Sequence, residues 1–210
     1  KVMRKDQVKS KASDAGNLKI PSFSKHASYE ERYAAGKTLR KICPRSAHSK
    51  WKLPHKRKSV ISLIEESEAG RVESLIPLRH GRMSQSPFTF YRAGALLMAA
   101  DLSTTPNTGY KPQICGDCHL SNFGGFATPE RQIIFSINDM DETLPAPWEW
   151  DVKRLATSFV IACRNNGLSK TVAKSSARRV VESYRRHMLE FSKMRQMELW
   201  YYMIESKTLM

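Results

Sequence analysis

Polar side chains that could do chemistry are concentrated between Cys115 and Asp141. Asp117 follows a short apolar stretch, Asn122 comes five residues later, and Asp139 lies 17 residues beyond Asn122, at the end of a second apolar stretch. A strand–loop–strand unit would bring these three side chains into one small volume. An aspartate can orient a hydroxyl and accept its proton, and carboxylate and amide oxygens are ligands that Mg²⁺ accepts. The spacing therefore predicts a site for phosphoryl transfer, although the same residue types are also common in turns.

The same segment fits three other kinds of site. Cys115 to His119 form a C-x-x-C-H pattern, which is typical of haem attachment, and the two thiols would also suit a redox pair or half of a zinc site. Haem attachment requires export and leaves the Asp and Asn spacing unexplained. A zinc site lacks its second cysteine pair, and a thioredoxin-like redox pair normally opens a helix in a βαβ unit. We keep these sites as minor alternatives.

Three basic side chains are further candidates for the site. His119 would either hydrogen-bond a backbone carbonyl and hold the loop in shape, or help to position phosphate or metal. Arg82 and Arg92 are candidates for phosphate contact, because a guanidinium group can donate two parallel hydrogen bonds to phosphate oxygens. The competing interpretation of Arg92 is an ion pair with an acid such as Asp101 or Asp151.

The elements that must position these residues are mostly helices. Ser86-Pro87 is a helix-start signal, and apolar residues recur from Val152 at the spacing of an amphipathic helix that Asn166-Gly167 would end. Two stretches rich in Ile and Phe are the expected strands. We expect helices over 29–42, 60–71, 86–102, 148–165 and 169–194, strands over 113–115 and 131–137, turns at 107–109 and 128–130, and a loop or short strand over 75–83.

Positive charge is concentrated at the N-terminal end of the chain. Residues 1–58 hold 17 Lys and Arg against four acids, which accounts for +13 of the formal net charge of +15. We interpret 1–58 as a basic, largely disordered leader and linker that could contact an anionic partner non-specifically, and 59–210 as the folded domain. No aromatic interleaving or nucleic-acid motif accompanies the charge, so a specific reader of nucleic acid is not indicated.

Cysteine usage and hydropathy bear on location. The four cysteines, Cys43, Cys115, Cys118 and Cys163, are scattered rather than arranged as a disulfide framework, which favours a reducing compartment and a cytoplasmic location. No run of 18 apolar residues occurs, so a membrane-spanning helix is not expected.

Gly116 to Asn122 resembles the catalytic loop, G-D-x-H-x-x-N, of the aminoglycoside phosphotransferase and choline kinase branch of the protein-kinase-like superfamily. Ile137 to Glu142 resembles the metal-binding segment of that branch, and Trp150 to Ala156 resembles the helix that follows. The resemblance implies an α+β, mostly helical fold like the large lobe of a protein kinase, with a short β-hairpin carrying the catalytic loop. It implies an ATP- and Mg²⁺-dependent phosphotransferase acting on an unknown hydroxyl acceptor. It assigns catalysis to Asp117 and His119, metal binding to Asn122, Asp139 and Asp141, and an anchoring role to Asp151.

A closer resemblance, over about residues 35 to 205, is to an uncharacterised bacterial family, DUF2252. It rests on Arg45 to His48, Gly81 to Met83, Ser86 to Arg92, Met98 to Leu102 and the run from Cys115 to Leu155. The chain departs from the kinase-like pattern in two ways: Cys115 stands where those enzymes usually have His, and no Gly-rich phosphate loop precedes Asp117. We therefore expect an incomplete domain that lacks its nucleotide-covering lobe. The alternative function is a catalytically inactive nucleotide-binding or interaction module.

Overall fold

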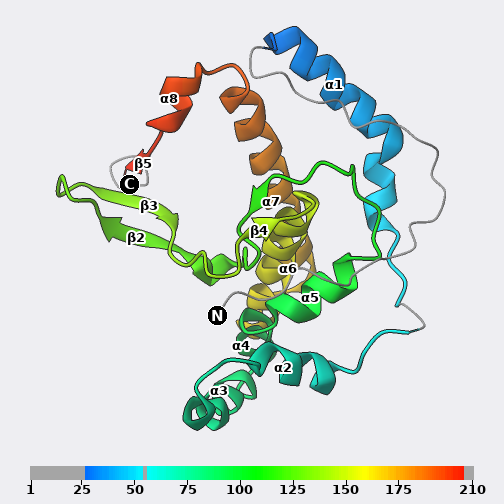
Figure 1. Cartoon of the computed structure of the whole chain (residues 1–210), viewed down its shortest axis with the longest axis vertical. Coiled ribbons are helices and arrows are strands. Elements are labelled where there is room, and N and C mark those ends of the chain that lie inside the picture. The colour runs from blue at the N-terminus through cyan, green and yellow to red at the C-terminus, as the bar shows by residue number, and fades with distance from the viewer. Residues whose placement is uncertain (1–26, 54–55, 206–210) are drawn as a thin grey trace.

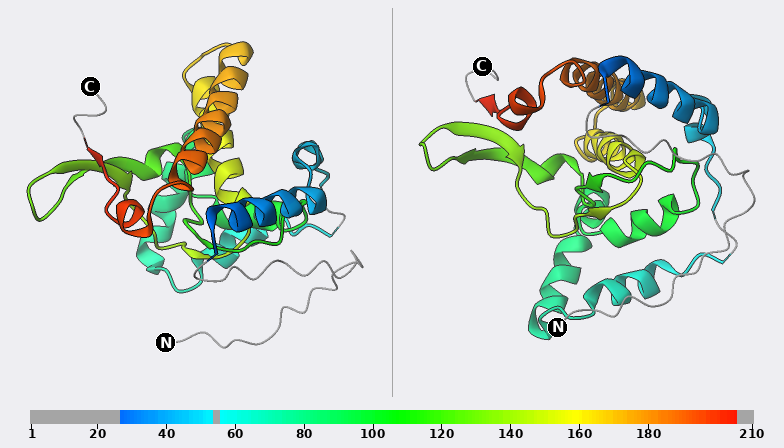
Figure 2. Two further views of the ribbon diagram at one scale, coloured as in Figure 1. Left: turned by 90° about the horizontal axis from the view of Figure 1, so that it is seen from above. Right: turned by 45° about the horizontal axis from the view of Figure 1, so that its top comes forward.

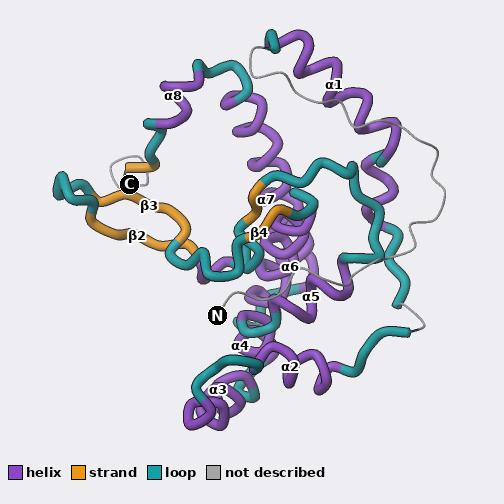
Figure 3. Tube along the Cα trace, viewed as in Figure 1, coloured by secondary structure: helices purple, strands orange, loops and turns teal. Residues whose placement is uncertain are grey.

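The computed structural model of the chain describes residues 27–53 and 56–205. It is an α+β structure in which helices predominate and the strands form two small sheets (Figure 3). Residues 1–26 of the basic segment 1–58 lie outside the described residues. The described structure begins with the helix predicted over 29–42, α1, and a short 3₁₀ turn, η1, both within the segment interpreted as leader and linker.

Two long helices form the centre of the molecule and pack against each other (Figure 1). The first, α6, is followed by Gly167 in a left-handed conformation with φ of 71°, and Ser169 then caps α7 by accepting a hydrogen bond from the backbone N–H of Val172. Both signals were present in the sequence, and they turn the chain back on itself. The side-by-side arrangement of α6 and α7 is visible in both views of Figure 2. The helices are α1 (Tyr29–Ile42), α2 (Val60–Glu68), α3 (Ile76–Met83), α4 (Pro87–Arg92), α5 (Ala95–Leu102), α6 (Glu149–Asn165), α7 (Lys170–Phe191) and α8 (Gln196–Trp200).

The β2–β3 hairpin projects away from the central helices (Figure 1). One sheet pairs β1 with β4, and the other has the order β2-β3-β5, with every pair antiparallel. The strands are β1 (Gln113–Ile114), β2 (Phe123–Ala127), β3 (Ile133–Ile137), β4 (Leu144–Pro145) and β5 (Ile204–Glu205), and the 3₁₀ turns are η1 (Arg45–Ser49), η2 (Glu73–Leu75) and η3 (Leu120–Asn122).

The strand–loop–strand prediction was wrong in its pairing. The two predicted strands do not pair with each other, because β1 pairs with β4 and β3 pairs with β2. β2 lies inside the segment that we predicted to be loop, where Gly124 and Gly125 made a strand difficult to recognise. The candidate catalytic loop therefore lies before the β2–β3 hairpin and not at its tip.

Two further elements differ from the prediction. Residues 76–83 form a helix, α3, instead of a loop or strand, because Pro77 lies in the first turn, where its missing N–H has no helical acceptor to lose. The helix predicted over 86–102 is divided into α4 and α5 at Ala93 and Gly94. This break exposes backbone carbonyls that prove important for the site.

The buried face of α6 also differs from the predicted one. Its fully buried side chains include Arg154 and Ser158, whereas the apolar positions such as Leu155 and Phe159 are only partly covered. On α7, the apolar side chain of Val172 is exposed. Within the described ranges, no helix is long and apolar enough to cross a membrane.

Candidate active site

The loop from Cys115 to Asn122 is held against α6 by polar side chains of that helix. The Asp151 carboxylate accepts hydrogen bonds from the backbone N–H groups of Cys115 (2.7 Å) and Gly116 (3.1 Å). About two turns further along the helix, the Ser158 hydroxyl accepts a hydrogen bond from the Leu120 N–H at 2.9 Å. Because a loop this buried cannot satisfy its N–H groups with water, these acceptors determine its path.

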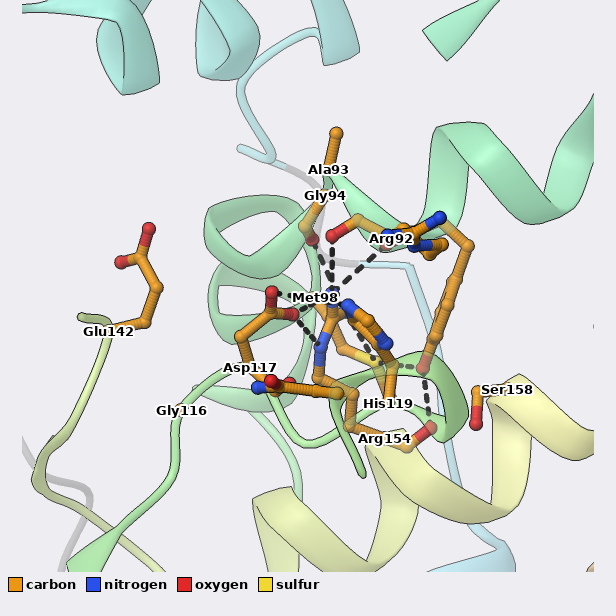
Figure 4. Close-up of polar contacts among 12 residues, drawn as sticks. Arg92, Ala93, Gly94, Met98, Gly116, Asp117, His119, Glu142, Arg154 and Ser158 are labelled. Carbon is orange, nitrogen blue, oxygen red and sulfur yellow. Dashed lines mark hydrogen bonds and ion pairs between the residues drawn. The ribbon is translucent and has the colours of Figure 1, made fainter. Parts of the chain in front are cut away.

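Arg154, which lies between those two residues on the same face, connects the loop to the α4–α5 break. Its guanidinium Nε donates to Asp117 Oδ1 at 2.8 Å, and Nη2 pairs with the same oxygen. The guanidinium also donates to the carbonyls of Tyr91 (3.0 Å), Arg92 (3.4 Å) and Gly94 (3.5 Å), which lie at the break between α4 and α5. Figure 4 shows Asp117 and Arg154 directly beneath the α4–α5 connection. The side chain of Arg154 is only 2% exposed, so this ion pair is largely shielded from water.

Asp117 is ionised at neutral pH in this environment. Burial by itself would raise the pKa of its carboxyl group, but the neighbouring His119 and the positive charge of Arg154 outweigh burial and leave the pKa below its ordinary value. One oxygen, Oδ1, is taken by Arg154, whereas Oδ2 lies 3.4 Å from His119 Nε2. Asp117 therefore presents a charged carboxylate with one oxygen, Oδ2, that is not held by Arg154.

His119 is buried beside Asp117 and keeps one ring nitrogen unused. Within the described residues its imidazole contacts the Asp117 carboxylate and not a backbone carbonyl, which differs from the loop-holding interaction that we considered. The other nitrogen, Nδ1, is buried and has no hydrogen-bond partner there. An unsatisfied buried nitrogen costs stability, so it is a group on which a ligand could gain a hydrogen bond.

Asn122 joins the first loop to the second, which runs from Asp139 to Glu142. Its Nδ2 donates to the carbonyls of Asp117 (3.1 Å) and Asp139 (2.9 Å), and its Oδ1 accepts from the Asp139 N–H at 3.0 Å. The loops also approach closely at Gly116, where a Cβ atom would overlap the Glu142 carbonyl oxygen. Gly116 has φ of 78°, so both its backbone conformation and the space around it require glycine.

A cleft of about 970 Å³ opens beside these loops. Asp117, His119 and Asp139 of the loops line it, and so do Arg82 and Arg92 with other residues of α3 and α4. The sequence thus predicted five of the residues that meet at this cleft. Of the other predicted site residues, Asn122, Asp141 and Asp151 are not among those that line it, and the binding roles given to all these residues stay predictions.

Arg92 does not make the ion pair that we considered as an alternative. Asp101 is engaged by Arg57, whose Nε and Nη2 lie 2.5 and 3.1 Å from its carboxylate oxygens, and Asp151 accepts the loop N–H groups described above. Arg92 and Arg82 are both exposed and have no acidic partner within the described ranges. Both guanidinium groups are therefore available to a ligand in the cleft.

Cys115 and Cys118 are buried on either side of Asp117, and both are free thiols. They lie close enough to interact by a hydrogen bond, and this interaction lowers the pKa of Cys115. Cys115 Sγ also accepts a hydrogen bond from Asn122 Nδ2 at 3.7 Å. The Cys115 thiol therefore forms part of the contact between the two loops.

The site residues that sequence reasoning missed are Arg154 and Ser158. With Asp151 they follow the i, i+3, i+7 spacing of one helix face. That polar stripe is visible in the sequence, but it runs beside a better-formed apolar stripe, which we took to be the whole buried face. A basic residue three positions after an anchoring aspartate was the available signal for a partner of Asp117.

Comparison with known proteins places this site within a recognised region. A family model described as an uncharacterized protein conserved in bacteria (DUF2252) matches residues 71–210. The matched region contains α3 to α8, both loops and nearly all of the cleft, and it begins later than the resemblance that we noted from about residue 35. No curated protein and no solved structure matches the chain, so the likeness to a kinase lobe stays a prediction.

Proposed function

The chain belongs to the DUF2252 family of bacterial proteins, and from that premise and the geometry of the cleft we propose that it is a Mg²⁺- and ATP-dependent phosphotransferase acting on a hydroxyl group. The observation that carries the proposal is the pairing of two kinds of group in one cleft. The carboxylates of Asp117 and Asp139 and the unpaired guanidinium groups of Arg82 and Arg92 line the same space. Phosphoryl transfer requires both an acceptor for a hydroxyl proton and positive groups for phosphate oxygens.

Arg82 and Arg92 would bind the phosphates. A third arginine of the cleft, Arg79, shows by contrast what a structural arginine looks like there, since it donates to Glu68 Oε1 at 3.1 Å and to the Ala93 carbonyl at 3.0 Å. The guanidinium group of Arg79 thus has a structural role. Within the described ranges, the guanidinium groups of Arg82 and Arg92 make no hydrogen bond or ion pair with the protein. Charge-assisted hydrogen bonds from such groups are about twice as strong as neutral ones.

Asp117 would orient the attacking hydroxyl. Its lowered pKa keeps it ionised, so Oδ2 can accept a hydrogen bond from the hydroxyl and receive its proton as transfer proceeds. Arg154 would hold the carboxylate in one orientation through Oδ1. The unused Nδ1 of His119 would take a hydrogen bond from the bound molecule, which would satisfy the one buried nitrogen that the folded loop leaves unpaired.

The residues present fit a magnesium ion that is held jointly with a ligand. No group of three or more His, Cys, Asp and Glu side chains within the described ranges could hold a metal ion without help. Mg²⁺ usually takes only one or two protein carboxylates and completes its shell with substrate phosphates and water. Asp139 is exposed at the cleft and offers such a carboxylate. When bound there, Mg²⁺ would neutralise negative charge on the phosphate oxygens. Asn122 would contribute indirectly, because its amide already positions Asp139 through the backbone.

One observation favours a second candidate, a nucleotide-binding module without catalysis. Arg154 neutralises much of the charge on Asp117, and an aspartate in a buried ion pair can have a purely structural role. Under this alternative, Arg82 and Arg92 would still bind phosphates, but no proton would be transferred to Asp117.

The test uses the chain of residues 1–210 and separates the two candidates. Calorimetry with ATP, in the presence and absence of Mg²⁺, measures binding, and release of inorganic phosphate from ATP measures transfer to water. We expect Mg²⁺-dependent binding that R82A/R92A weakens by roughly 10- to 100-fold, because two charge-assisted contacts are lost. The matched control is Arg179→Ala, which removes an exposed arginine of α7 far along the chain from the cleft.

Asp117→Asn distinguishes enzyme from binding module. For the enzyme, phosphate release falls by about 100-fold or more while ATP affinity changes little, since general-base groups contribute that much to rate. Phosphate release that is insensitive to Asp117→Asn, or binding without release, would select the module. Absence of Mg²⁺-dependent ATP binding to the folded chain would overturn both candidates.

A further inference from the structure

The cleft has two chemically different ends, and the proposed function uses only one of them. Leu75, Leu78 and Arg82 all line the cleft and follow the i, i+3, i+7 spacing of one helix face, from the residue before α3 to its last turn. At a rise of about 1.5 Å per residue, Leu75 and Arg82 lie about 10 Å apart along the helix axis. The face of α3 that lines the cleft is therefore apolar at its beginning and basic at its end.

The basic end of the cleft is the end that holds Asp117. Arg154 donates to Asp117 Oδ1 at 2.8 Å and to the Arg92 carbonyl at 3.4 Å, so these two lining residues are neighbours. Figure 4 shows both of them beside the Arg154 guanidinium group. The end of α3 lies against α4 here, since the Thr89 hydroxyl donates to the Met83 carbonyl at 3.4 Å. The proposed proton acceptor and the phosphate-binding arginines therefore share this end.

The opposite end of the cleft is lined by apolar side chains that the fold leaves uncovered. Val72, Leu75 and Leu78 line it and are 63%, 56% and 52% exposed. The charged neighbour of Val72, Arg71, has a partner in the second loop, because its Nη2 lies 3.8 Å from Glu142 Oε1. Exposed apolar side chains that gather in a cleft are typical of a surface that binds the apolar part of a ligand.

The charges of the lining residues limit the kind of molecule that fits the apolar end. Of the two acids that line the cleft, Asp117 is paired with Arg154, and Asp139 is the proposed ligand of Mg²⁺. Among the described residues at the apolar end, no carboxylate is left for a positively charged group, and Arg71 is already paired with Glu142. A charged molecule would lose water there without gaining a partner, which is costly. This end therefore suits an uncharged molecule.

We propose that the hydroxyl acceptor is an uncharged alcohol with an apolar body, which lies along α3 with its body against Val72, Leu75 and Leu78 and its hydroxyl at Asp117. This inference rests on the proposed function, because it names the acceptor class of the same site. In the transfer step, the hydroxyl oxygen forms a bond to the γ-phosphorus of ATP as the bond from that phosphorus to the bridging oxygen breaks. ADP leaves with the electron pair of the broken bond, and the hydroxyl proton passes to Asp117 Oδ2.

The experiment follows the methyl NMR signals of Leu and Val in the chain of residues 1–210 during titration with small alcohols. The probes are 1-hexanol, the shorter 1-butanol, and 6-amino-1-hexanol, which has the same carbon chain with a positive charge. We expect 1-hexanol to shift the signals of Val72, Leu75 and Leu78 and to bind roughly 5- to 15-fold more tightly than 1-butanol, because two more methylene groups are buried. Binding of 6-amino-1-hexanol should be weaker than that of 1-hexanol by about 5-fold or more.

The double variant Leu75→Ser/Leu78→Ser tests the assignment of the apolar end. Both leucines are more than half exposed, so the variant should fold, and the Val72 methyl signals still report binding. We expect the affinity for 1-hexanol to fall by about 10-fold or more, because most of the apolar contact is lost. The matched control is Leu189→Ser, which removes an exposed leucine of α7 and should leave the affinity unchanged.

Three results would overturn the proposal. The first is 1-hexanol that leaves the Val72, Leu75 and Leu78 signals unshifted, and the second is 6-amino-1-hexanol that binds as tightly as 1-hexanol. The third is a loss of ATP affinity in Leu75→Ser/Leu78→Ser as large as the loss for 1-hexanol, which would assign the apolar end to the base of the nucleotide. The alcohol titrations contain neither ATP nor Mg²⁺, so failure of the acceptor class can be distinguished from failure of the proposed function, which the ATP calorimetry reports.

Discussion

The two loops that meet at the cleft are held in very different ways. The loop from Cys115 to Asn122 is mostly buried, and its N–H groups donate to Asp151 and Ser158 of α6 while Asp117 pairs with Arg154 of the same helix. In the loop from Asp139 to Glu142 all four residues are exposed. Its backbone is held to the first loop mainly through the amide of Asn122.

This difference indicates that the cleft has one carboxylate in a fixed position and another whose position can adjust to a ligand. A carboxylate that must orient a reacting group gains from a fixed position, and Asp117 has one. A carboxylate that shares a metal ion with a ligand gains from some freedom, because the ligand supplies part of the coordination. Asp139 has that freedom, since its loop lacks a buried anchor of its own. Three predictions test whether the contrast is real.

The largest effect is expected from removing the anchor of the first loop. Arg154→Met leaves the Asp117 carboxylate and three backbone carbonyls without their partner in a largely buried position. We expect the free energy of unfolding to fall by about 3 kcal/mol, the range typical of breaking a buried ion pair from one side. Urea unfolding measures it, and Arg164→Met, at an exposed position of the same helix, should cost no more than about 0.5 kcal/mol.

Hydrogen exchange sharpens this prediction. In Arg154→Met, the amides of Cys115, Gly116 and Leu120 should lose protection, while exchange in residues 139–142, already exposed, should change less. Equal changes in both loops, or no loss of stability, would show that α6 does not hold the first loop selectively.

Local signals in the sequence located most of the elements, and the site depended on contacts that such signals do not encode. The helix-start residues Ser86 and Ser169 and the helix-ending Gly167 have the roles that their types predict. The prediction of strand pairing was wrong for a physical reason. β1 pairs with a strand 30 residues further along the chain, beyond the β2–β3 hairpin, and a two-residue strand is too short to show a periodic pattern. The buried role of Arg154 was missed for a related reason. A charged residue becomes buried only when a charged partner and hydrogen-bond acceptors surround it, and these come from the loop and from the break between α4 and α5.

The second prediction tests the close approach of the loops at Gly116. Gly116→Ala must both strain a left-handed backbone and displace the Glu142 carbonyl. We expect a loss of about 2 kcal/mol in the free energy of unfolding, within the range for a strained backbone position. Gly167→Ala is the control, because Gly167 has φ of 71° with open space around it and should show the backbone cost without the collision.

The difference between the two alanine variants measures the loop contact. If Gly167→Ala costs as much as Gly116→Ala, the second loop moves aside at no cost, and the contact between the loops contributes nothing to stability. A larger cost for Gly116→Ala means that the second loop is held in place even though its side chains are exposed.

The smallest effect concerns how two acids of this region respond to pH. The folded-state pKa of Asp117 lies below its ordinary value of about 4, so its stabilising contribution is complete above that pH and is lost as pH falls through the folded-state pKa. For Asp151, burial raises the pKa despite the two N–H groups that it accepts from. A raised carboxyl pKa favours the protonated folded state, so the contribution of Asp151 decreases as pH rises above about 4.

Urea unfolding of wild type, Asp117→Asn and Asp151→Asn between pH 3 and 7 separates the two contributions. The stability advantage of wild type over Asp117→Asn should shrink as pH falls below about 4, and its advantage over Asp151→Asn should grow as pH falls from 7 toward 4. Trends of the same sign would contradict the assigned environments. Opposite signs would mean that His119 and Arg154 keep Asp117 charged where burial alone would not. The first loop would then present a charged carboxylate to the cleft because of these two neighbours, one from the loop itself and one from α6, and not because of its exposure to water.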